Sequence, residues 1–496
     1  MGYRFRTISF SLAITAGLSG LSQGAVTWSG NGNVNNSGSW NTAANWTGGT
    51  GVPGSADVPG LGNVTATRTV TVDTTPASAV KGITFTQTTT GVVNTFAISA
   101  GATLTLTNGG NAYGTTTNAA AGVGSVVANI DGTLSFTTSN AAAQTLANTI
   151  NLGGGSAIQY TAVSSPTINV AGALNTNAGS GNTATITTSV FGGSGTFAFN
   201  TLSGSTLSVS SGTLNISNPV NNSATSIAYS AAFGSTATIS SGATLALTTG
   251  TGTGSKSATV SNAGSLTQAG TIAIRSSGSN GIASVTNTGT WTIPDTTAQV
   301  TQKSATSPKN LSITNDVGGV LTGSGTLTVA NENTGLPAVT LTNNGTVDPG
   351  ASGIGKLTLS NVKVAFGATQ GTLRLDADAA TVGHYDVLAL AAGSTTGTGV
   401  LDLSGTGDVL DLHLLNGFSP TSNFTLAGFA TFASRVGAFD TIRLNGVALP
   451  TSWSANVVYN ATSADLVVTV PEPASLAVLA AMLGLASLRR VRSKSF

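Results

Sequence analysis

The chain of 496 residues contains no cysteine and little charge, since Asp, Glu, Lys and Arg together make up 7% of it. The absence of cysteine excludes disulfide bonds and thiol catalysis, so packing and backbone hydrogen bonds must stabilise the fold. Two histidines, His384 and His413, are the only imidazole bases. No charged residue occurs from Gly132 to Ser255. Disorder is not indicated, because 40% of the residues are hydrophobic.

Residues 1–25 have the pattern of a secretory signal peptide. Arg4 and Arg6 precede an apolar run from Ile8 to Leu21, and small residues surround Ala25. A basic end, an apolar segment and a small-residue site in this order predict cleavage by signal peptidase. We therefore expect the mature protein to begin near residue 26 and to be exported.

The last residues combine two prolines, a short apolar run and a basic end. Pro471 and Pro473 cannot continue a β-ladder. The apolar run from Ala474 to Leu488 would form a helix of about 22 Å, which is short of the ~30 Å hydrocarbon core. The basic residues that follow should stay cytoplasmic. This pattern favours a transient anchor that is removed by processing over a permanent membrane anchor.

A resemblance to a known sorting signal involves Val470, Pro471, Glu472, Pro473, Arg489 and Arg490. With the short apolar run between them, these residues closely resemble the PEP-CTERM signal of Gram-negative bacteria. The resemblance implies recognition by an exosortase, a membrane-embedded transpeptidase-like enzyme, and then release of the body or its attachment to the cell surface. It also implies an association with exopolysaccharide and biofilm, and it predicts no activity.

Removal of both ends reverses the sign of the net charge. The whole chain has a formal net charge of +1, whereas residues 26–470 contain eleven basic and fifteen acidic residues, a formal net of −4. No basic face remains that would favour nucleic acid, so we expect no nucleic-acid partner.

A weak repeat of short strands occupies the body. Its unit is a glycine, a small residue, and apolar residues alternating with Ser, Thr or Ala, beginning at Gly101, Gly132, Gly195, Gly212, Gly242, Gly270, Gly289, Gly325 and Gly371. Period-two alternation buries one face of each strand, and we expect each glycine to form a corner with positive φ. Spacing of mostly about 17 to 35 residues is typical of a solenoid. The pattern predicts an all-β parallel β-helix, with a β-sandwich as the alternative.

A second resemblance supports this prediction. The segments Thr342–Gly350 and Ile354–Leu359 look like autotransporter-associated β-strand repeats, and the opening from Trp28 to Trp46 resembles the start of proteins that carry them. Those proteins have right-handed β-helical passengers and are mostly exported surface proteins or adhesins. The resemblance therefore implies a right-handed parallel β-helix.

Shifts in composition divide the chain into five expected segments. They are a signal peptide at 1–25, a Trp-rich N-terminal cap at 26–80, solenoid repeats at 81–366, a C-terminal β region or cap at 367–470, and the sorting signal at 471–496. Charge and phenylalanine increase after residue 367, as expected where unlike residues close the open end of a solenoid.

Few residues are candidates for chemistry. His384 and His413 are interpreted as surface or cap residues, and the many hydroxyls show no triad signal. The best metal candidates are Asp376, Asp378 and Asp386, because an Asp-x-Asp sequence supplies the oxygen ligands that Ca²⁺ prefers. The favoured interpretation is instead a solvated strand face beside a turn. Apart from this possible Ca²⁺ site, we expect no cofactor.

These observations favour a non-enzymatic structural or adhesive protein of the cell surface or extracellular matrix. Two alternatives stay open, a polysaccharide lyase or hydrolase, which needs clustered carboxylates in a groove, and a calcium-dependent glycan-binding module. Trp28, Trp40 and Trp46 could stack on sugar rings, but covering the first turn of the solenoid is favoured. Trp291 is expected in the core.

Overall fold

The computed structural model describes residues 26–471 and Met482. Within that range it leaves out 31–32, 34, 49–50, 86, 88, 90, 108–124, 138–143, 147–148, 163–166, 191–195, 219–225, 251–255, 277–281, 305–310, 332–337, 352, 368–370 and 394. The expected signal peptide and nearly all of the expected sorting signal lie outside the described residues.

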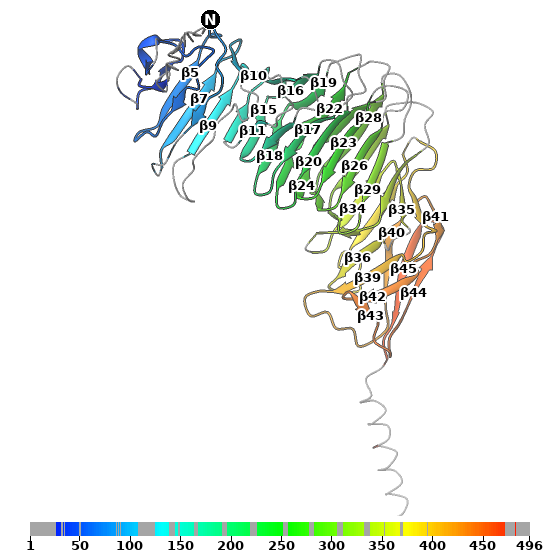
Figure 1. Ribbon diagram of the computed structural model, residues 1–496. Helices are drawn as coiled ribbons and strands as arrows, with labels where there is room; N and C mark the ends of the chain where they lie inside the picture. The colour runs from blue at the N-terminus through cyan, green and yellow to red at the C-terminus, as the bar shows by residue number, and fades with distance from the viewer. Residues whose placement is uncertain are drawn as a thin grey trace, which may run out of the picture.

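The described chain forms a right-handed parallel β-solenoid of about eleven turns, stacked along a curved rod (Figure 1). A full turn contributes one strand to each of three sheets, which have 14, 11 and 16 strands. The predicted parallel β-helix is thus confirmed. The β-sandwich alternative is wrong, because successive turns pair in parallel, as Leu214 does with Leu245.

The first sheet contains β8 (Thr103–Leu106), β10 (Thr133–Thr137), β13 (Ala157–Ala162), β16 (Thr183–Val190), β19 (Thr213–Asn218), β22 (Thr244–Thr249), β25 (Thr271–Ser276), β28 (Thr297–Ser304), β31 (Thr326–Asn331), β34 (Lys356–Ser360), β37 (Val387–Ala391), β40 (Phe424–Thr431), β44 (Ser454–Tyr459) and β45 (Ser463–Thr469). The pairs β40–β45 and β44–β45 are antiparallel, so the parallel stacking ends here.

The second sheet contains β11 (Gln144–Leu146), β14 (Thr167–Val170), β17 (Thr196–Thr201), β20 (Ser226–Ala231), β23 (Ala258–Asn262), β26 (Ala283–Asn287), β29 (Leu311–Asn315), β32 (Val339–Asn343), β35 (Val362–Phe366), β38 (Val400–Leu403) and β41 (Ser434–Gly437).

The third sheet contains β2 (Gly38–Ser39), β5 (Arg68–Val72), β7 (Val93–Ile98), β9 (Ser125–Ile130), β12 (Thr149–Leu152), β15 (Ala173–Asn177), β18 (Thr206–Ser211), β21 (Thr236–Ile239), β24 (Ser265–Gln268), β27 (Thr290–Ile293), β30 (Val320–Gly323), β33 (Thr346–Pro349), β36 (Thr372–Ala377), β39 (Val409–Leu414), β42 (Thr441–Leu444) and β43 (Val447–Ala448). Because β5 and β36 belong to one continuous sheet, no break in this sheet coincides with the expected boundaries at residues 80 and 366.

A small sheet and a tryptophan cluster cover the N-terminal end. The sheet consists of β1 (Thr27–Trp28), β3 (Trp46–Thr47), β4 (Gly60–Leu61) and β6 (Thr84–Phe85), and the 3₁₀ helix η1 (Ala43–Asn45) precedes β3. Trp46 packs edge-on against Trp28 and Trp40, with ring centroids 5.0 and 4.7 Å apart. All three side chains are buried, so they cannot stack on sugar rings. Their burial fits the favoured interpretation, in which they cover the first turn of the solenoid. Trp291 is in the core, as predicted.

The core consists of apolar side chains stacked from turn to turn. Leu214 pairs with Leu245 and Ile216 with Leu247 between β19 and β22, and all four are fully buried. Each such burial contributes about 1.5–3 kcal/mol. In β19 the residue between them, Asn215, is partly exposed, as the period-two pattern predicts.

Two reasons require glycine in the repeats, and Gly212 combines both, since a Cβ atom on it would lie 2.4 Å from the carbonyl oxygen of Gly179. Gly212 has φ of +68°, as expected for a corner. Gly270 does not have positive φ, which corrects the general expectation. A Cβ atom on Gly270 would lie 2.3 Å from the carbonyl oxygens of both Ser240 and Ala243 in the preceding turn. Close approach of the backbones therefore requires glycine there.

A buried ladder of asparagines runs along one corner of the solenoid. Asn262 donates to Asn287 at 2.7 Å, Asn287 to Asn315 at 2.8 Å, and Asn315 to Asn343 at 2.7 Å. The Asn315 amide also donates to the carbonyl oxygen of Thr346 at 2.9 Å. The last of these bonds satisfies a backbone carbonyl at the start of β33, where the chain has passed from the second sheet to the third.

We predict that Asn315→Ala lowers the free energy of unfolding by about 2–4 kcal/mol, because it removes the buried donor to Asn343 Oδ1 and to the Thr346 carbonyl and one acceptor of the Asn287 amide. Asn151→Ala is the matched control. Asn151 bonds to Asn129 at 2.8 Å and to Asn175 at 3.0 Å in a more exposed ladder, where water can replace the amide. Asn151→Ala should therefore lower the free energy of unfolding by less than about 1 kcal/mol. Urea denaturation measures both, and equal losses would contradict this explanation.

Candidate functional site

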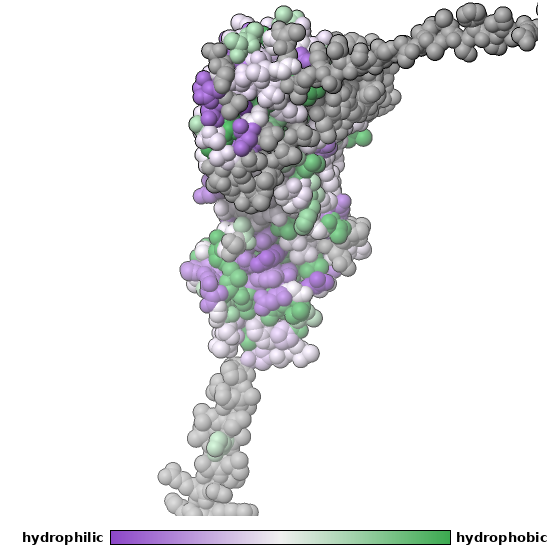
Figure 2. All heavy atoms as spheres, turned by 60° about the vertical axis from the view of Figure 1, so that its left-hand side comes forward, coloured by the Kyte–Doolittle hydropathy of each residue, from purple (hydrophilic) through white to green (hydrophobic). Residues whose placement is uncertain are grey.

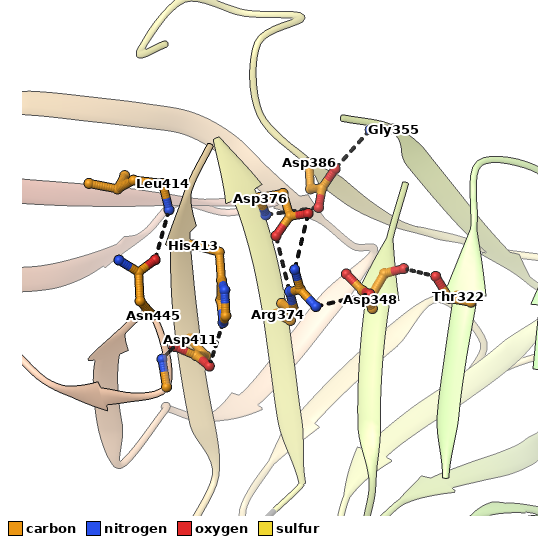
Figure 3. Close-up of polar contacts among 11 residues, drawn as sticks. Thr322, Asp348, Gly355, Arg374, Asp376, Asp386, Asp411, His413, Leu414 and Asn445 are labelled. Carbon is orange, nitrogen blue, oxygen red and sulfur yellow. Dashed lines mark hydrogen bonds and ion pairs between the residues drawn. The ribbon is translucent and has the colours of Figure 1, made fainter. Parts of the chain in front are cut away.

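Three buried carboxylates meet near the C-terminal end of the solenoid. They belong to Asp348 on β33, Asp376 on β36, and Asp386, which immediately precedes β37. One oxygen atom of each lies within 4.8 Å of the others. Asp348 is 5% exposed, Asp376 is 1% exposed and Asp386 is fully buried. Figure 3 shows the three side chains converging around Arg374.

Strand pairing brings these residues together. Val347 pairs with Leu373 between β33 and β36, so the next residues, Asp348 and Arg374, are neighbours. Asp386 returns through the turn after β36, where its N–H donates to the carbonyl oxygen of Asp376 at 2.9 Å. The Asp386 carboxylate accepts hydrogen bonds from the N–H groups of Gly355 at 2.7 Å and Asp376 at 2.8 Å.

Arg374 is the cation within this cluster. Its Nε donates to Asp376 Oδ1 at 3.0 Å, and its Nη1 lies 3.7 Å from Asp348 Oδ2. Among the described residues, Asp348 Oδ1 has no hydrogen-bond partner although it is buried. The single positive charge of Arg374 therefore compensates only part of the negative charge that three ionised carboxylates would have.

Burial disfavours the ionised forms of two of these acids. It raises the pKa of Asp386 to about 8; the two backbone hydrogen bonds oppose this rise, and the charges of Asp376 and Asp348 add to it. Burial also raises the pKa of Asp348 to about 6, opposed by Arg374. Asp348 and Asp386 thus retain protons more readily than exposed aspartates do.

The structure divides the predicted metal candidates. Asp376 and Asp386 meet, but Asp378 is outside the cluster and contacts His384 at 2.9 Å and Asn416 at 3.4 Å. Asp378 is partly exposed in the bend after β36. The interpretation as a solvated strand face is wrong for Asp376 and Asp386, which are buried. Sequence reasoning missed Asp348, although it lies within the repeat-like segment Thr342–Gly350.

Both histidines form pairs with aspartates near the C-terminal end. His384 is largely exposed beside Asp378, and His413 Nε2 lies 2.9 Å from Asp411 Oδ2 on β39. Their positions fit the interpretation as surface or cap residues.

Charges also form a column on the third sheet. Asp348, Arg374, Asp411 and Arg443 occupy successive turns, with Arg374 paired to Asp411 and Asp411 to Arg443. Figure 2 shows strongly hydrophilic residues gathered on the C-terminal part of the rod. Alternating sign makes each stacked neighbour attractive.

The described chain leaves the fold where the expected sorting motif begins. The N–H of Val470 donates to Asn423 Oδ1 at 2.9 Å, and Pro471 is exposed. Glu472, Pro473, Arg489 and Arg490 lie outside the described residues. Among the residues that the structure describes, no helix is long and apolar enough to span a membrane.

Comparison of the chain with protein-family models and with curated proteins gives no match.

A further buried acid, Asp408, lies outside the cluster and directly before β39. It is fully buried, and neither carboxylate oxygen has a hydrogen-bond partner among the described residues. Burial raises its pKa to about 6, and the charges of Asp440 and Asp402 add to the rise. By contrast, Asp402 Oδ2 contacts Lys363 Nζ at 2.6 Å. Burial tends to raise the pKa of Asp402, but the hydrogen bonds from Lys363 and Ser404 outweigh it and lower the value overall.

We predict that Asp408→Asn stabilises the protein at pH 8 by about 1–2 kcal/mol and has little effect below pH ~4. The raised pKa means that folded Asp408 holds its proton more tightly than the unfolded chain does. Its contribution to stability is therefore present below the ordinary value and is lost as the pH rises through about 6.

Denaturation at a series of pH values measures this difference, with Asp402→Asn as the matched control. Because the pKa of Asp402 is lowered, that variant should lose stability at pH 8 and approach the wild type in acid. A difference between Asp408→Asn and wild type that is independent of pH would contradict the prediction.

Proposed function

We propose that the chain is an exported, non-enzymatic protein of the cell surface or extracellular matrix of a Gram-negative bacterium. A PEP-CTERM signal at its C-terminus would be processed by an exosortase-type enzyme, after signal peptidase removes the N-terminal segment. Until that processing, the C-terminal helix would hold the chain in the inner membrane. The body would act structurally or as an adhesin, in contact with exopolysaccharide or other glycans.

The observation that carries this proposal is the end of the folded body. Strand β45 ends at Thr469, and its antiparallel pairs with β40 and β44 close the first sheet. Val470 is still buried, whereas Pro471 is exposed. The motif therefore begins where the fold ends, so removal of the tail would leave these strands intact.

The outward face of the solenoid supports a role in many weak contacts. Thr238, Thr267, Thr292 and Thr322 occupy successive turns of the third sheet, and the first three are partly exposed. Such columns present hydroxyl groups at the ~4.8 Å spacing of a β-ladder. Hydroxyls and amides can bind the hydroxyls of a glycan without any charged residue.

The position of the carboxylates favours this function over a polysaccharide lyase or hydrolase. Asp348, Asp376 and Asp386, with Arg374 beside them, have the composition that such chemistry uses. Each acid is at most 5% exposed, so a polymer cannot reach their oxygen atoms.

We predict that the motif residues control the location of the body. The triple variant Pro471→Ala, Glu472→Ala, Pro473→Ala should stay in the membrane fraction at the size of the unprocessed chain. The wild type should reach the cell surface or the medium at a smaller size. Cell fractionation followed by immunoblotting measures both.

The matched control is Ser493→Ala, Lys494→Ala, Ser495→Ala, which changes three tail residues outside the motif and should behave as the wild type does. A chain without residues 471–496 should lose surface attachment. The same distribution for the wild type, the motif variant and the truncated chain would contradict the sorting proposal.

A further inference from the structure

When its carboxyl groups are ionised, the acidic cluster has more negative charge than its protein contacts compensate. In their ionised forms, three carboxylates and one guanidinium have a formal net charge of −2. All three acids are buried, where water screens charge weakly and an uncompensated ion is costly. A charge-compensating ligand would remove that cost.

One atom of the cluster points to such a ligand independently of the charge. Asp348 Oδ1 is buried and has no hydrogen-bond partner among the described residues. The other oxygen of Asp348 faces Arg374, and the close-up in Figure 3 shows the side chain directed into the cluster. Buried carboxylate oxygens normally accept hydrogen bonds or bind a cation.

The separation of the oxygen atoms fits a shared ion. Oxygen ligands lie 2.3–2.6 Å from Ca²⁺, so two of them on opposite sides of the ion are about 5 Å apart at most. The three ligand atoms of Asp348, Asp376 and Asp386 lie within 4.8 Å of one another. One ion can therefore contact all three.

We propose that Asp348, Asp376 and Asp386 form a binding site for a hard divalent cation, Ca²⁺. The donor atoms are all carboxylate oxygens, which Ca²⁺ prefers over the nitrogen and sulfur ligands of zinc sites. His413 pairs with Asp376 between β36 and β39, but its Nε2 lies 2.9 Å from Asp411 Oδ2. The sequence contains no cysteine.

The ion would have a structural role. It joins β33, β36 and the segment that leads into β37, just before the parallel turns give way to the antiparallel strands β40, β44 and β45. Arg374, which is more exposed than the acids, remains the partner of Asp376. This proposal does not depend on the function of the protein, because it concerns the stability of the last turns.

Calorimetric titration of the EDTA-treated full chain with CaCl₂ tests the proposal. The wild type should bind Ca²⁺ with saturable heat, and its melting temperature should rise with the Ca²⁺ concentration. Asp348→Asn should weaken Ca²⁺ binding at least about tenfold, because it removes one of the charged ligands. Circular dichroism shows whether this conservative variant is folded.

Asp378→Asn is the matched control, because Asp378 is two residues from Asp376 but contacts His384 and Asn416 instead of the cluster. It should bind Ca²⁺ as the wild type does. Terbium luminescence gives a second measure of binding if Asp348→Asn alters the stability of the apo protein. The proposal fails if the wild type shows neither binding heat nor a change in melting temperature, or if the two variants bind Ca²⁺ equally.

Discussion

Parallel pairing between successive turns places each side chain beside its counterpart, at the ~4.8 Å spacing of a β-ladder. Residues at equivalent positions of successive turns therefore contact one another along the rod. This stacking is stabilising for leucine and isoleucine, because they form continuous apolar columns, as Leu214 does with Leu245. Stacking is also stabilising for asparagine, because each side-chain amide can both donate and accept a hydrogen bond. The ladder from Asn262 to Asn343 is an example. Threonine occupies an outward column at Thr238, Thr267 and Thr292.

The same constraint accounts for the scarcity and the arrangement of charge. Stacked like charges repel, and the chain has no charged residue from Gly132 to Ser255. In the C-terminal column, Asp348, Arg374, Asp411 and Arg443 alternate in sign. The alternation is not universal, because Arg275 pairs with Lys303. The cluster around Asp386 departs further from alternating charge, because three acids there share one arginine.

Local patterns in the sequence predicted the fold well. Period-two alternation after each glycine indicated the strands, and the spacing of the repeats indicated a solenoid. Other features depend on which strands become neighbours. Gly212 has positive φ, and at both Gly212 and Gly270 the backbone of the preceding turn leaves no room for a Cβ atom. Similarly, Asp376 and Asp386 are close in sequence and were candidates, but Asp348 joins them only through the pairing of β33 with β36. A single sequence does not specify that register.

The direct test of the stacking constraint is a double-mutant cycle on neighbouring turns. Thr267 and Thr292 pair between β24 and β27 and are both partly exposed. The free energy of unfolding would be measured for Thr267→Asp combined with Thr292→Asp and combined with Thr292→Arg, together with the single variants. Stacking predicts an unfavourable coupling of about 0.5–1 kcal/mol for the like-charged pair and a favourable coupling for the opposite pair. Additive effects in both combinations would contradict it.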